Sequence, residues 1–136
     1  MNIQTSVSKF NNLAEEFLNK MIKTFPDEKK LSVYLIHFKT TKTFSSKKPA
    51  EFFTLPLIPY AKQLMSKDEK FFKKDELVNG IESFSEQTGL IDRWESMTPK
   101  IKESIWNYLQ SLLVLGMMVL NRQQELQNII SLINSD

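Results

Sequence analysis

Hydrophobic residues recur at steps of three and four along most of this chain, the spacing of an amphipathic helix. Between Val7 and Ile22 such positions alternate with lysine, glutamate and asparagine, which predicts a first helix that ends at Phe25-Pro26. A second helix is expected to begin at Pro26, because proline suits the first helical position and the acids that follow it complement the positive end of the helix dipole. Its apolar positions are Leu31, Tyr34, Leu35 and Phe38.

The strongest pattern lies between Pro99 and Leu120, where Thr98-Pro99 provides a threonine cap and a proline at the first helical position. Two apolar stripes run side by side through this segment, so we expect a central helix at roughly 99–120 that is buried on two sides. The pattern continues more weakly into a C-terminal helix at about 121–134. The sequence leaves open whether residues 99–134 form one helix or two, with a break near Gly116 or Asn121.

The middle of the chain predicts short elements. Residues 39–48 are polar and basic and are expected to form a loop, and three prolines then allow only brief helices at 50–54 and at 59–65. Residues 68–72 are expected to form a turn whose phenylalanines point inward. A helix at 75–87 should end near Gly89 in a left-handed cap, and residues 90–97 should form a short helix that places Trp94.

These elements predict an all-α fold, a compact single-domain helical bundle of about five to seven helices that spans residues 1–136. A chain of 136 residues is the size of one ordinary domain, and its three glycines leave few tight turns for β-hairpins. We expect the core to be determined by apolar and aromatic residues of the central helix and the turns before it: Phe72, Trp94, Ile105, Trp106, Tyr108, Leu109 and Leu112.

The composition excludes several kinds of chemistry. Without cysteine the chain has no disulfide, thiolate ligand or cysteine nucleophile, and with His37 as its single histidine it has no site of several histidines. No glycine-rich phosphate loop is present, and no pair of acids stands out as a general acid and base. We therefore expect no catalytic residue, metal, cofactor or small-molecule substrate, and no enzymatic activity.

Charge is unevenly divided along the chain. Residues 1–74 carry a net charge of +7 and residues 75–136 a net charge of −5. Lysines together with nearby Phe38 and Phe44 could bind the phosphates and stack on the bases of a nucleic acid. A solvated face, or a basic half that folds against the acidic half, explains the same lysines. The candidate nucleic-acid surface comprises Lys39, Lys42, Lys47, Lys48, Lys70, Lys73 and Lys74.

The C-terminal segment has a narrow apolar stripe and almost no charge apart from Arg122 and Glu125. Such a helix either closes the bundle or pairs with a partner, including a second copy of the chain. The N-terminus lacks the features of a signal peptide, and the apolar run from Ile105 to Leu120 is shorter than the ~20 residues that span a bilayer. We therefore expect an intracellular protein with no membrane span.

Several motifs resemble a family of small uncharacterised proteins encoded by nucleocytoplasmic large DNA viruses, the giant viruses. The resemblance covers residues from about Phe10 to Leu120. It includes the Phe25-Pro26 step, Pro49, Ile58-Pro59-Tyr60, the segment from Lys67 to Phe72, Trp94 and, most distinctively, the KxxIWxYLxxL pattern that begins at Lys102. The resemblance implies a viral protein located in the cytoplasm or virus factory of an infected host, or in the virion, and it implies no activity.

Three hypotheses of function follow. The first is a viral helical interaction or structural protein, associated with the virion or its assembly site, that binds a protein partner or itself. The alternative is a nucleic-acid binding or packaging protein that uses the lysine-rich N-terminal half. The third is a modulator of host machinery that acts through a helical groove.

Overall fold

A computed structural model describes residues 2–72 and 86–135. Within those residues the fold is all-α, with seven α-helices, three short 3-10 helices and no strand. This confirms the predicted fold class. The predicted helix at 75–87 lies, apart from its last two residues, outside the described residues. The elements in order are α1 (Ile3–Thr24), α2 (Lys29–Phe44), α3 (Lys48–Thr54), η1 (Leu55–Tyr60), α4 (Ala61–Met65), η2 (Glu69–Phe72), α6 (Leu90–Arg93), η4 (Trp94–Ser96), α7 (Pro99–Val119) and α8 (Gln123–Asn134).

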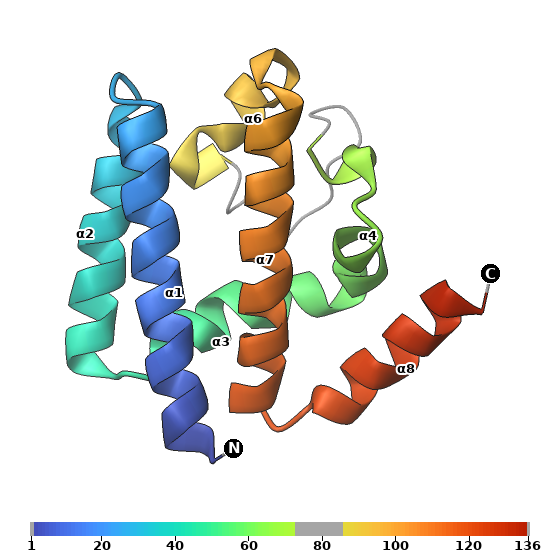
Figure 1. Ribbon diagram of the computed structural model, residues 1–136. Coiled ribbons are helices and arrows are strands. Elements are labelled where there is room, and N and C mark those ends of the chain that lie inside the picture. The colour runs from blue at the N-terminus through green and yellow to red at the C-terminus, as the bar shows by residue number, and fades with distance from the viewer. Residues whose placement is uncertain (1, 73–85, 136) are drawn as a thin grey trace.

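Helix α7 is the centre of the bundle, as the double apolar stripe predicts. Helix α1 packs along its length, and α3, α4 and α8 contact other parts of it (Figure 1). Leu113 and Met117 of α7 are fully buried, and the core extends from them to Phe17 and Leu18 of α1. No helix among the described residues is long and apolar enough to cross a membrane.

Both ends of α7 are capped by local hydrogen bonds. At its start the Thr98 hydroxyl accepts a hydrogen bond from the Ile101 amide at 3.2 Å, with Pro99 at the first helical position. At its end Asn121 adopts a left-handed conformation with φ 58°, and the amide of Arg122 donates to the Met117 carbonyl at 2.8 Å. This is the geometry of a Schellman motif. Residues 99–134 therefore form two helices, and the break is at Asn121.

Gly116 lies inside α7 and has a packing role. A Cβ atom at this position would lie 1.8 Å from the Thr54 hydroxyl oxygen of α3. The absence of a side chain therefore lets α3 cross close to α7. The Thr54 side chain is fully buried there, and its hydroxyl has no hydrogen-bond partner.

The prediction of a basic loop at 39–48 is wrong. Helix α2 continues to Phe44, α3 begins at Lys48, and only residues 45–47 lie between them. Threonines give the segment a weak helix propensity, but Phe38 is buried in the core and the lysines of the last turns reach Glu15 of α1. These contacts between helices outweigh propensity. Helix α2 also begins later than expected, at Lys29, with the Glu28 side chain as its cap.

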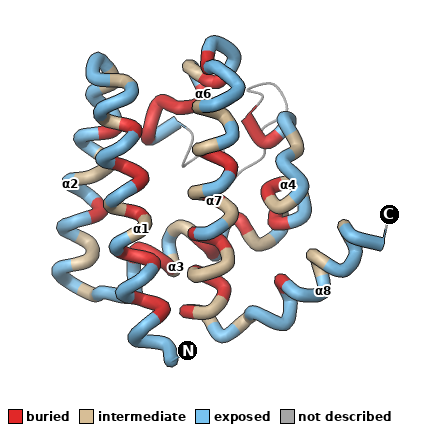
Figure 2. The backbone as a smooth tube through the Cα atoms, viewed as in Figure 1, coloured by how far each residue is buried: buried red, intermediate tan, exposed pale blue. Residues whose placement is uncertain are grey.

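Helix α8 is much less buried than the other long helices. It leaves the bundle after α7, and its exposed surface predominates in Figure 2. Leu126 is buried and Ile129 and Ile130 are half-buried against the core, whereas Leu132 is exposed. The helix begins at Gln123, two residues later than the sequence predicts.

Candidate functional site

The motif residues meet in one aromatic cluster inside the bundle. Phe72 stacks on Trp94 with ring centres 3.9 Å apart, and both rings meet Trp106 edge to face. The Trp94 indole donates a hydrogen bond to the Glu69 carboxylate. Lys102 lies 5.2 Å from the Trp94 ring centre and 3.9 Å from that carboxylate, so one cation contacts both groups. These motifs therefore join η2, η4 and α7, which is a role in folding.

The predicted core residues are buried with one exception. Tyr108 lies at the edge of the core, half-buried, where it packs on Phe17 with ring centres 5.1 Å apart. Its hydroxyl donates a hydrogen bond to Glu16 at 2.9 Å, which holds the ring at the surface of α1 and α7. Burial and this hydrogen bond raise the pKa of Tyr108. The six residues that are buried as predicted are Phe72, Trp94, Ile105, Trp106, Leu109 and Leu112.

The candidate lysines do not form one surface among the described residues. The ammonium groups of Lys39 and Lys42 lie 3.6 Å and 3.5 Å from the carboxylate of Glu15, so both charges are partly neutralised by α1. Lys47 and Lys48 lie at the start of α3, whereas Lys70 belongs to η2, on the other side of α7 in Figure 1. Lys73 and Lys74 lie outside the described residues.

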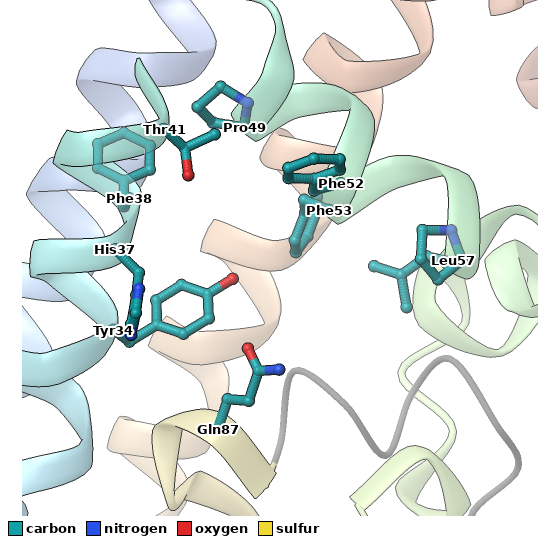
Figure 3. A pocket seen from close by; sticks show the side chains of 10 residues that line it. Tyr34, His37, Phe38, Thr41, Pro49, Phe52, Phe53, Leu57 and Gln87 are labelled. Atoms are coloured by element: carbon teal, nitrogen blue, oxygen red, sulfur yellow. The ribbon is translucent and has the colours of Figure 1, made fainter. Parts of the chain in front are cut away.

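A groove that the sequence did not reveal lies between α2 and the segment formed by α3 and η1. Figure 3 shows aromatic side chains from both walls facing one another across it, with Gln87 at one end. Its volume is about 280 Å³. We call it the α2–α3 groove, and its described lining residues are Tyr34, His37, Phe38, Thr41, Pro49, Phe52, Phe53, Pro56, Leu57 and Gln87.

The groove continues along α2 into a second hollow of about 470 Å³. The two share Tyr34, His37 and Gln87, and the second adds Lys30, Val33 and Glu86. They form one furrow that follows the outer side of α2. A furrow along a helix offers a continuous surface to a ligand with an elongated shape.

Exposed hydrophobic side chains concentrate around this furrow. Of the seven large hydrophobic side chains that are exposed among the described residues, five belong to α2, α3 and η1. Phe44 is 87% exposed and Phe52 is 63% exposed, values rarely needed for folding alone. Clusters of exposed apolar residues are typical of binding surfaces. The five residues are Val33, Ile36, Phe44, Phe52 and Leu55.

The polar groups in the furrow are few. Burial raises the pKa of Tyr34 to about 12, so its hydroxyl stays protonated at neutral pH and can donate a hydrogen bond. Phe52 carries Lys48 over its ring, with the ammonium 5.5 Å from the ring centre. The described residues contain no group of three or more His, Cys, Asp or Glu placed to hold a metal ion. The furrow can therefore accept an apolar surface and fix it with a small number of polar contacts.

The sequence contained a weak signal for this furrow. Helix α2 carries Val33, Ile36 and Phe44 outside the stripe that faces the core, so apolar residues surround more of the helix than burial requires. Phe44 was interpreted as a residue that stacks on bases. The second wall could not be foreseen, because it depends on where α3 lies relative to α2.

No protein-family model, curated protein or solved structure matches this chain.

Proposed function

We propose that this chain is a non-enzymatic interaction protein that binds another protein through the α2–α3 groove. The observation that carries the proposal is the concentration of exposed hydrophobic side chains on the two walls of one furrow. Water contact with these side chains is unfavourable, and a partner that covers them gains roughly 25 cal/mol for each Å² of apolar surface removed from water. Large aromatic residues such as Phe52 are suited to anchor such a contact.

We further propose that the protein acts in a cell infected by a large DNA virus, in the virus factory or as part of the virion. Support for this context comes from the motif resemblance described above, above all from the KxxIWxYLxxL pattern that begins at Lys102. The identity of the partner separates two forms of the proposal. A second viral protein corresponds to a structural role, and a host protein corresponds to a modulator of host machinery.

Site-specific photo-cross-linking tests the proposed surface. A photoreactive amino acid replaces Val33 on the furrow or Leu132 on α8, which are 53% and 61% exposed, in full-length protein made in its natural cell. We expect one protein to cross-link at Val33 and not at Leu132. Substitution of Phe52 by alanine should abolish that cross-link. Equal cross-linking from both positions, or none from Val33, would refute the proposal.

Light scattering of the purified protein, with and without a short DNA duplex, tests the nucleic-acid alternative. Phosphate contacts are strongest at low salt, so binding that depends on lysines should increase the mass at about 50 mM salt and disappear as salt is raised. The interaction hypothesis predicts a mass that DNA does not change. A DNA complex that is lost after substitution of Lys47 and Lys48 would favour the alternative.

A further inference from the structure

The walls of the α2–α3 groove restrict the backbone structure of its occupant. Both walls are helical, so their backbone amides and carbonyls are used in hydrogen bonds inside α2 and α3. The groove therefore has no sheet edge to which an extended peptide could add a strand. A segment that already satisfies its own backbone groups loses nothing when it enters such a groove, and among regular structures this describes a helix.

The arrangement of side chains favours an amphipathic helix. Phe38 and Phe53 lie deep in the groove, and the more exposed Phe52 lies at its mouth (Figure 3). Apolar side chains that recur every three or four residues on a bound helix would contact this surface over successive turns. Polar contacts would come from side chains such as Tyr34 at the wall.

The charges at the furrow favour acidic residues on that helix. Lys30 lines one end, and Lys48 lies over Phe52 at the other. Glu86 is the acid among the described lining residues, and Glu51 is the acid of α3. Six lysines and no acid occur between residues 29 and 50.

Other charges near α2 are already paired. Glu15 binds Lys39 and Lys42 on the side of α2 that faces α1, and Arg93 binds Asp27 and Glu28 before the helix begins. The lysines at the two ends of the furrow therefore leave a net positive charge beside an apolar surface.

We infer that the partner segment is an amphipathic helix whose apolar stripe enters the α2–α3 groove and whose flanking acidic residues face Lys30 and Lys48. This inference rests on the proposed function and specifies its partner. A like-charged helix would bring lysines against these two positions. Charge complementarity would thus select among partners with similar apolar stripes.

Fluorescence anisotropy with designed peptides tests the inference on the purified full-length chain. Two labelled helical peptides share one stripe of leucines and differ only in their flanking positions, which are glutamate in one and lysine in the other. We expect the glutamate peptide to bind about tenfold more tightly, because each exposed charge pair contributes a few tenths to ~1 kcal/mol and each like pair costs a similar amount. Added salt should reduce the difference.

Three variants locate the binding. Substitution F52A should weaken the glutamate peptide at least tenfold, whereas L132A, which removes an equally exposed side chain from α8, should leave its affinity unchanged. The double substitution of Lys30 and Lys48 by glutamine should remove the preference for glutamate over lysine. Circular dichroism confirms that each variant retains its helices.

The outcomes separate this inference from the proposed function. Equal affinity for the two peptides would overturn the charge argument, and binding that F52A does not change would overturn the location. If neither peptide binds but the Val33 cross-link forms, the partner is not such a helix and the inference fails while the proposed function stands. Absence of both binding and cross-link would refute both.

Discussion

Substitution of Gly116 by alanine should destabilise the protein, although helix propensity alone predicts the opposite. Gly116 is inside α7, and in an ordinary helix interior alanine is more favourable than glycine by ~1 kcal/mol. Here the new Cβ would lie 1.8 Å from the Thr54 hydroxyl oxygen, 3.0 Å from its Cβ and 3.2 Å from its Cγ2. Contacts this short require α3 or α7 to move.

The magnitude follows from two opposing terms. Overpacking of a close-packed core costs typically ~1–3 kcal/mol, and the upper part of that range applies because the obstructing side chain is fully buried. After subtraction of the propensity gain we expect a net loss of about 2 kcal/mol in the free energy of unfolding. For a domain of this size that corresponds to a decrease of roughly 8 °C in the melting temperature.

Urea and thermal unfolding followed by circular dichroism measure this loss, and a mutant cycle identifies its cause. Substitution T54A removes the hydroxyl and the methyl group, and it should cost ~1 kcal/mol or less by itself, because a buried hydroxyl without a hydrogen-bond partner is lost with the methyl. In the double variant we expect partial recovery, since the two Cβ atoms still lie 3.0 Å apart.

Ser111 provides a control on the same helix. It is exposed, so substitution S111A should show only the small propensity gain of a few tenths of a kcal/mol. A G116A variant as stable as the natural chain, or a double variant no more stable than G116A, would refute the reasoning.

Three further predictions concern the cap of α7 and two titratable groups. Substitution T98A should lower the free energy of unfolding by ~1 kcal/mol, because the Ile101 amide loses its acceptor, and T98S should retain most of it; equal losses in urea unfolding would contradict this role. The hydrogen bond from Arg93 lowers the pKa of Asp27, so the pair should stabilise the fold above the ordinary aspartate pKa and lose this contribution as the pH falls through the lower folded value. Substitution R93Q should flatten the acid side of a stability profile measured by urea unfolding, and an unchanged profile would exclude the pair. In a spectrophotometric titration one of the three tyrosines should titrate near pH 12, and Y34F should remove that step; its persistence in Y34F would assign it elsewhere.

The sequence predicted elements that depend on local chemistry and on strong periodicity. Thr98-Pro99 fixed the start of α7, because a hydroxyl cap and a proline act on residues within one turn. The double apolar stripe identified α7 as central, and the inward Phe71-Phe72 turn and the left-handed Gly89 were also confirmed. The core positions of the aromatic motifs followed from the same reasoning, since large apolar side chains at helical spacing need burial.

Contacts between distant segments decided the rest. The sequence could not place Glu15 beside Lys39 and Lys42, so it missed the last turns of α2, which these ion pairs and a buried Phe38 stabilise. It offered Gly116 as a possible break, whereas the close approach of α3 explains that glycine and the break lies at Asn121.

The α2–α3 groove depends on tertiary structure most of all. Its two walls are contributed by helices that are adjacent in sequence, yet each wall alone reads only as a helix with surplus apolar residues. Whether those residues are covered or left exposed depends on the direction in which α3 leaves α2 and crosses α7. Periodicity reports the faces of one helix, but a groove exists only in the relative placement of two.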